Sequence, residues 1–204
     1  MKIALLSVLC LAASAPSFAA SAQMTSEERA KVVGYLRDSQ KEFLSYVDGV
    51  SEEQWKWKSA PDRWSVGETA EHIVLAEGFL LDLVKKAMAS APDPDWEAKT
   101  KGKTAMLERI LVDRSHPVQA PEPIRPEHLT LTRDQVIARF KELRARTIEF
   151  AETTDLPLKE HITDGPFPQM GPLNAYHFML YIPLHNIRHD KQIAEVKATP
   201  GYPK

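Results

Sequence analysis

The 204-residue sequence has a single cysteine, Cys10, and little glycine, with 8 glycines against 15 prolines. It contains neither a G-x-x-x-x-G-K-[ST] run nor a G-x-G-x-x-G run, so it lacks the common glycine-rich loops that bind nucleotide phosphates. Charge of neither sign dominates, because 26 Lys and Arg residues stand against 28 Asp and Glu residues, for a net charge of -2. The sequence therefore lacks the basic footprint of a nucleic-acid-binding protein.

The first 22 residues resemble a secretory signal peptide. Lys2 supplies a basic start, residues 3–15 form an apolar stretch, and small residues suited to cleavage follow near residues 19 and 22. The apolar stretch is too short to span a bilayer comfortably, so we expect cleavage rather than a stable membrane anchor. We predict a mature domain of residues 23–204 in the periplasm or outside the cell. The alternative is that Met24 is the true start and the protein is cytosolic.

Removal of the signal peptide would also remove Cys10 and leave a mature chain without cysteine. That excludes disulfides, a cysteine nucleophile, Cys-ligated zinc and iron–sulfur clusters. Any metal site must then be built from histidines and carboxylates.

Hydrophobic residues recur at helical spacing in four long segments, and no segment has a convincing strand pattern. We predict four amphipathic helices, at about residues 26–49, from 66 to before Pro92, from 133 to about 150, and from Pro172 in the first turn to about 196. Short helical turns are expected at 51–57 and 104–113, and proline-rich or irregular loops at 117–126 and 154–171. Four helices that each bury one stripe most simply form an all-α four-helix bundle of one domain.

Four of the seven histidines fall on predicted helices, and three of these face inward. His185 and His189 are four residues apart and so share one helical face, while His72 lies at the edge of the inward stripe of the second helix. Three buried imidazoles need partners, which leaves two interpretations open. They bind a metal together, or backbone, carboxylates and water satisfy them separately. The three remaining histidines lie in predicted loops and are interpreted as surface residues: His116, His128 and His161.

Two motifs carry a resemblance to a known family. The run Trp55–Glu68 (WKWKSAPDRWSVGE), followed by Glu71–Ile73 (EHI), and the late run His185–Gln192 (HNIRHDKQ) resemble the DinB/YfiT-like superfamily. The resemblance extends from Met24 to about Lys197. It implies an up-down-down-up four-helix bundle with a three-histidine metal site, whose ligands by position are His72, His185 and His189. It assigns no role to Gln192, which matches the family's glutamine.

Several neighbours of these histidines have structural interpretations. His177 and Tyr181 continue the four-residue spacing but rotate away from His185, so we interpret them as pocket lining or core. Asp190 points about 100° from His189 and is expected at the surface. The tryptophans are interpreted as core residues under the second helix, with substrate stacking as the alternative: Trp55, Trp57 and Trp64.

The resemblance implies one divalent ion per chain, and imidazole ligands favour zinc or nickel. It further implies a metal-dependent hydrolase or a transferase of the thiol S-transferase type that acts on a small molecule. The alternatives are a non-catalytic bundle that binds metal or a small ligand, in stress response or metal handling, and a structural module with vestigial histidines. We also expect a homodimer, because the first and third long helices offer apolar surface that one bundle need not bury.

Overall fold

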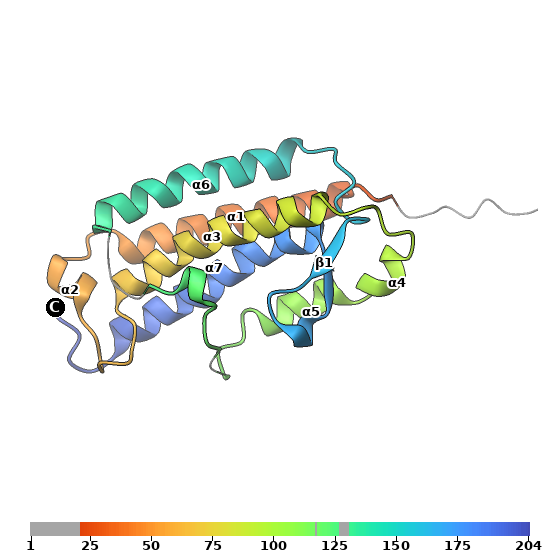
Figure 1. The fold of residues 1–204 in the computed structure, drawn as a ribbon. Coiled ribbons are helices and arrows are strands. Elements are labelled where there is room, and N and C mark those ends of the chain that lie inside the picture. The colour runs from red at the N-terminus through yellow and green to blue at the C-terminus, as the bar shows by residue number, and fades with distance from the viewer. Residues whose placement is uncertain (1–20, 117, 127–130) are drawn as a thin grey trace, which may run out of the picture.

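Four long helices form the bundle seen in the computed structural model, which describes residues 21–116, 118–126 and 131–204 (Figure 1). They are α1 (Ser26–Val47), α3 (Val66–Met88), α6 (Arg133–Thr153) and α7 (Ala175–Ala198). Both α6 and α7 pack against α1 and α3. The helices α3 and α6 run in one direction, whereas α1 and α7 run in the other (Figure 1). The all-α, up-down-down-up bundle is therefore confirmed.

Shorter elements fill the connections. They are α2 (Glu52–Lys56), α4 (Trp96–Thr100), α5 (Lys103–Ile110), the 3-10 turns η1 (Glu122–Ile124) and η2 (Pro168–Met170), and the strands β1 (Ile162–Asp164) and β2 (Pro172–Asn174). Because α3 and α6 are parallel, the chain must return along the bundle between them, and the described part of this crossover is residues 89–116, 118–126 and 131–132. Its α5 packs on α7 and its η1 packs on α3, so the crossover lies against the two helices that carry the inward histidines.

Capping boxes fix where the long helices begin. In each box the cap side chain accepts the backbone N–H three residues later, and the side chain of that later residue bonds back to the cap N–H. The pairs are Thr25 with Glu28, Ser65 with Glu68, Thr132 with Gln135 and Asn174 with His177. The first three starts agree with the predicted ones.

The start predicted for the last helix was wrong, because the sequence analysis missed a small sheet. The strands pair antiparallel, with Ile162 opposite Asn174 and Asp164 opposite Pro172. Pro172 thus belongs to β2 and not to the first turn of α7. The fixed φ of proline suits an edge strand as well as a first helical turn, so only the pairing partner decides between them.

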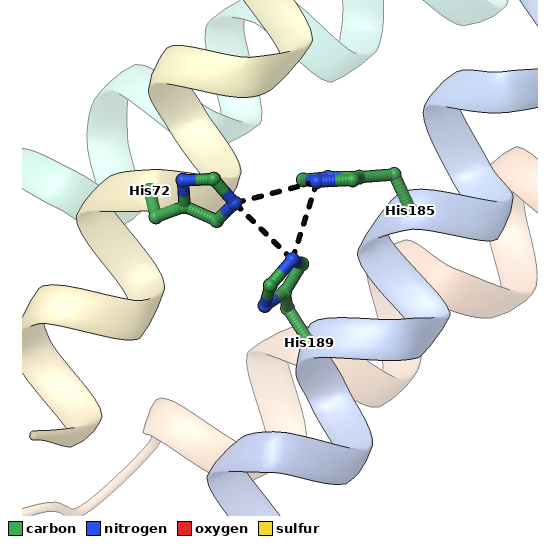
Figure 2. A group of neighbouring side chains, drawn as sticks. All are labelled: His72, His185 and His189. Carbon is green, nitrogen blue, oxygen red and sulfur yellow. Dashed lines mark hydrogen bonds between the residues drawn. The ribbon is translucent and has the colours of Figure 1, made fainter. Parts of the chain in front are cut away.

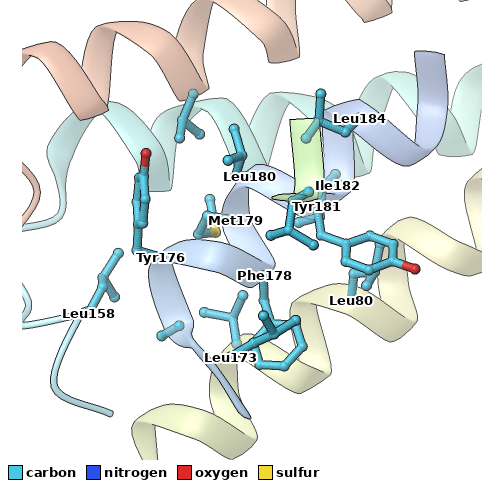
Figure 3. Packing of buried hydrophobic residues seen from close by; sticks show 14 of the residues in the cluster. Leu80, Leu158, Leu173, Tyr176, Phe178, Met179, Leu180, Tyr181, Ile182 and Leu184 are labelled. Carbon is cyan, nitrogen blue, oxygen red and sulfur yellow. The ribbon is translucent and has the colours of Figure 1, made fainter. Parts of the chain in front are cut away.

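The apolar core consists of two clusters, one toward each end of the bundle. One surrounds the first half of α7 and includes Leu80, Phe178 and Leu180 (Figure 3). The other includes Phe43 and Trp55. Between the clusters, the long helices contribute buried polar side chains that we call the polar layer: Ser39, Glu77, Arg144, Thr147 and Asn186.

Arg144 organises the polar layer, and as a charged residue it gave no hydrophobic signal in the sequence. Its Nε donates to Glu77 Oε1 at 3.0 Å, and its Nη2 donates to Asn186 Oδ1 at 2.8 Å. Its Nη1 donates to the carbonyl oxygen of Leu36 and to Ser39 Oγ, both at 2.8 Å. One guanidinium on α6 therefore bonds to all three other long helices.

The predicted signal peptide, residues 1–22, lies outside the described residues except for Ser21 and Ala22. Among the described residues, no helix combines the length and apolar character needed to cross a bilayer. The large apolar side chains that are exposed in this part of the chain are Val118 and Leu156, and neither lies on α1 or α6. The apolar side chains of α1 and α6 that reach the surface are only partly exposed, among them Leu44 and Ile137, and the homodimer stays a prediction.

Candidate metal centre

The three inward histidines meet between α3 and α7. Figure 2 shows His72 reaching from α3 toward His185 and His189, which project from successive turns of α7. The Nε2 atom of His72 lies 3.3 Å from Nε2 of His185 and 3.1 Å from Nε2 of His189. The Nε2 atoms of His185 and His189 are 3.2 Å apart. The Nε2 atoms thus form a nearly equilateral triangle.

The triangle has the size of a metal-ligand set. Imidazole nitrogens bind zinc at about 2.0–2.1 Å, so two nitrogens on one ion lie about 2.9–3.4 Å apart for coordination angles between octahedral and tetrahedral. All three nitrogen–nitrogen distances fall within that range. This group of ligand atoms could hold a metal ion.

Hydrogen bonds at the far side of two rings determine which nitrogen carries the proton. His72 Nδ1 lies 2.6 Å from the carbonyl oxygen of Ile124, which only accepts hydrogen bonds. His189 Nδ1 lies 2.8 Å from Gln192 Oε1, and Arg114 also donates to that oxygen, at 3.2 Å. Both Nδ1 atoms therefore carry the proton, and both Nε2 atoms present a lone pair.

The lone pairs of His72 and His189 consequently point at each other across 3.1 Å. His185 can offer one N–H at Nε2, but one N–H does not satisfy two facing lone pairs with good geometry. Facing lone pairs repel, and a cation placed among the three nitrogens converts that repulsion into coordination. The donor set therefore fits a divalent metal.

Burial keeps the three imidazoles neutral, which is the form that binds metal. His72 is buried, and burial lowers its pKa to about 4. Burial also lowers the pKa of His185 and of His189 well below 6.5, and the neighbouring imidazoles lower both further. At neutral pH no proton has to leave before a metal binds.

The comparisons with known proteins agree with this geometry. A model of the DinB superfamily matches residues 35–193, which include all three histidines. The chain belongs to the DinB superfamily. It is similar to a protein of Bacillus subtilis (strain 168) described as the uncharacterized protein YuaE, with 22% identity over 162 residues that cover 79% of this chain and 94% of the relative. No solved structure matches the chain.

Side chains from other parts of this DinB-superfamily chain lie close to the triangle of Nε2 atoms. The Trp64 ring lies 4.8 Å from the His72 ring and 6.2 Å from the His189 ring, between ring centres. Trp64 is therefore a neighbour of the site, whereas Trp55 is a buried core residue and Trp57 packs edge-on against Tyr202. Arg188 bonds to the carbonyl oxygens of Asp113 and His116 and so ties the crossover to α7.

His177 and Tyr181 are buried and are not among the three clustered histidines, in agreement with their interpretation as core or pocket lining. His177 has partners of its own. Its Nε2 lies 3.3 Å from Thr104 Oγ1, and its Nδ1 accepts the Asn174 N–H at 3.4 Å. It is therefore a buried histidine that other protein groups satisfy.

Two residues expected at the surface are buried, so those interpretations were wrong. His161 precedes β1 and its Nδ1 bonds the Ser90 carbonyl oxygen at 2.8 Å. Asp190 is fully buried because α7 packs against α1 as well as α3, so a direction away from His189 leads into the bundle. Burial and the nearby Glu42 raise the pKa of Asp190 to about 8. His116 is exposed as predicted, and His128 lies outside the described residues.

The groups that hold the histidine rings were not predicted from the sequence. The Ile124 carbonyl gives no sequence signal, because every residue has a carbonyl. Arg114 lies 78 positions before its partner Gln192. The spacing of His189 and Gln192, one helical turn apart, is the signal that could have revealed their bond.

Proposed function

We propose that this DinB-superfamily chain binds one divalent metal ion through the Nε2 atoms of His72, His185 and His189. The observation that carries the proposal is the pair of lone pairs that face each other across 3.1 Å. Zinc and nickel are the proposed ions, because neutral imidazole is a good ligand for both.

The proposed activity is that of a metal-dependent hydrolase or transferase, of the thiol S-transferase type, acting on a small molecule. Three protein ligands leave coordination positions open, as in catalytic rather than structural metal sites. When bound, the metal would supply the power to lower the pKa of a bound water or thiol, or to polarise a carbonyl.

The chain's own residues would hold the ligands in position. The Ile124 carbonyl orients the His72 ring, and the Gln192 amide orients the His189 ring. Trp64 packs against the His72 ring and restricts access of water to it. Such outer contacts fix both the tautomer and the direction of the lone pair.

The second candidate is a non-catalytic bundle that binds metal or a small ligand. What favours it is the composition of the ligand group, since no carboxylate or cysteine of the described residues joins the three histidines. The site thus has no obvious base of its own besides the imidazoles.

Metal analysis of the untagged protein tests the binding proposal. We expect about one zinc or nickel ion per chain, and loss of tight binding in His72→Ala, His185→Ala and His189→Ala. His116→Ala, which removes an exposed histidine, is the matched control and should retain the metal. Stoichiometric metal in a His185→Ala/His189→Ala double variant would refute the assignment.

Turnover separates the two candidates. Metal-loaded protein should convert members of a panel of esters and of thiol–electrophile pairs, and the three ligand variants should not. Full metal loading without turnover of any member favours the binding protein.

We also propose that the protein acts in the periplasm or outside the cell, which the basic start and the apolar stretch of residues 3–15 support. Mass spectrometry of protein from the native host should find an N-terminus near residue 20 or 23. A cytosolic protein that begins at Met1 or Met24 would contradict export.

A further inference from the structure

Arg188 is a buried cation that forms no ion pair with any described residue, since the carboxylates of Asp113 and Glu195 act on it only from beyond 4.0 Å. Its residue is 9% exposed, and its guanidinium donates to the carbonyl oxygens of Asp113 and His116. Among the described residues, no Asp or Glu oxygen lies within 4.0 Å of this guanidinium. Arg144, the other buried arginine, has Glu77 at 3.0 Å. A buried charge that no carboxylate contacts is costly, so the difference from Arg144 needs a reason.

The position of Arg188 supplies that reason. It lies three residues after His185 and seven after Tyr181, so the three side chains leave the same side of α7. Its charge lies within electrostatic reach of both His185 and Tyr181. Arg188 therefore lies about one helical turn from His185, which is the least buried residue of the three.

Tyr181 adds a hydrogen-bond donor at the same place. Its ring centre lies 6.0 Å from that of His185, and its hydroxyl lies at the edge of the apolar cluster (Figure 3). The hydroxyl forms no hydrogen bond with any described residue. It is also not one of the fully enclosed polar atoms without a partner in this part of the chain, so part of it is accessible. It is thus free to donate to a ligand.

The charge of the occupied centre points to the kind of ligand. Three neutral imidazoles leave a divalent ion with its full charge, and Arg188 adds one more positive charge beside it. Of its five N–H groups the guanidinium uses two on carbonyls, which leaves others for a ligand. A carboxylate has two oxygens, and it can place one on the metal and the other on a guanidinium.

We propose that the small molecule that completes this centre carries a carboxylate, which the Arg188 guanidinium and the Tyr181 hydroxyl bind beside the metal. This inference rests on the proposed function, because it requires an ion on the three histidines. It narrows the substrate class from any small molecule to small carboxylates.

Acetate binding to the cobalt(II)-substituted protein tests the inference, with visible absorption of the ion as the readout. Arg188→Gln should weaken acetate binding about tenfold, and Tyr181→Phe about threefold, as expected for loss of one charged and one neutral hydrogen bond. Affinity for neutral imidazole, which needs no counter-charge, should change less than twofold in both. Arg188→Lys should recover most of the acetate affinity.

Lys191→Gln is the matched control. Lys191 lies on the same helix, is exposed, and also bonds a crossover carbonyl, that of Val112. Its loss should leave the acetate affinity unchanged. If Arg188→Gln does not fold, Tyr181→Phe still tests the site, because Tyr181 makes no bond to the crossover, and Arg188→Lys tests it with the charge retained.

Each contrary outcome has its own meaning. Equal loss of acetate and imidazole binding would show damage to the metal site and overturn the carboxylate proposal. Unchanged acetate affinity in Arg188→Gln and Tyr181→Phe would also overturn it, and tighter binding of inorganic phosphate than of acetate would replace carboxylate by phosphate. Wild-type protein that takes up no cobalt would instead refute the proposed function itself.

Discussion

The bundle buries two groups of polar side chains that differ in how their polar atoms are satisfied. In the polar layer, the Arg144 charge meets the Glu77 carboxylate, and its remaining N–H groups reach two other helices. At the three histidines, the Nε2 lone pairs of His72 and His189 face each other and no protein group supplies a positive charge between them. In the first group the chain supplies a carboxylate for the buried charge, whereas in the second it supplies no cation for the facing lone pairs.

The comparison teaches that burial of polar groups alone does not mark a site. Both groups lie in the middle of the bundle, and both join several helices. What separates them is whether the Arg144 charge and the Nε2 lone pairs meet a partner of opposite character within the protein. This criterion predicts that changes in the polar layer alter stability, whereas changes at the histidines alter binding.

The largest effect is expected from the polar layer. Glu77→Leu would leave the Arg144 guanidinium buried without a counter-charge, which costs about 3–5 kcal/mol of unfolding free energy. The double variant Glu77→Leu/Arg144→Met removes both charges and should recover much of that loss. Urea denaturation measures both.

A surface ion pair between α1 and α6 is the control for this prediction. Arg37 pairs with Glu152 where both side chains are well exposed, so Glu152→Gln should change the unfolding free energy by less than about 1 kcal/mol. Wild-type stability in Glu77→Leu would contradict the structural role assigned to the polar layer.

Metal should stabilise the folded protein nearly as strongly. An ion that binds the native state alone adds about 3 kcal/mol at a free concentration one hundred times its Kd. Calorimetry of metal-free protein should therefore show a higher Tm when zinc or nickel is added. His72→Ala should lose most of this shift, because it removes the link between α3 and α7, whereas Glu77→Leu should keep it. An unchanged Tm for wild type would mean that the histidines bind no ion.

His177 can be compared with the three clustered histidines, because it is also buried but has hydrogen-bond partners in the protein. Burial, together with the charge of Lys103, lowers its pKa to about 4, below the 6.5 of the unfolded chain. The unfolded chain therefore binds more protons between these values. The stability linked to His177 is fully present above pH 6.5 and is lost as the pH falls toward 4.

In metal-free protein, His177→Gln should therefore reduce the difference in unfolding free energy between pH 7.5 and pH 4.5 by about 2–3 kcal/mol. The other buried histidines titrate in both proteins, so their effects cancel in this comparison. His116→Ala, at an exposed position, should leave the pH dependence unchanged. The same slope in wild type and His177→Gln would show that His177 is not shielded from protons.

The sequence predicted what depends on local periodicity and on motifs. Helical spacing and cap residues such as Ser65 were enough for the four helices, and the family motifs gave the three clustered histidines. Contacts between distant segments were not predictable in this way. Pro172 lies in a strand because it pairs with residues 162–164, which are distant from it in the sequence pattern. Arg144 is buried only because all four long helices pack around it, which its own helix does not indicate. Asp190 was misplaced because the spacing gives a direction on a helix but not what packs there.

The smallest effect is expected from the outer contact of His189. Gln192 Oε1 accepts the proton of His189 Nδ1, and Arg114 holds that amide in place. Loss of such a partner typically weakens metal binding by tenfold or more, so Gln192→Leu should raise the Kd for zinc about tenfold, or about 1.4 kcal/mol. Competition with a chromophoric chelator measures this Kd.

The conservative variant decides whether Gln192 acts through the imidazole proton or only through packing. Gln192→Glu keeps an acceptor for His189 Nδ1 and a partner for Arg114, so it should bind zinc as tightly as wild type. Nitrogen NMR of the imidazole ring should find the proton on Nδ1 in wild type and in Gln192→Glu, and a mixture of tautomers in metal-free Gln192→Leu. If Gln192→Leu keeps both the wild-type tautomer and the wild-type Kd, this hydrogen bond does not prepare His189 for the metal. The tautomer assigned to His189 would then no longer follow from this hydrogen bond, and only the lone pair of His72 would remain assigned.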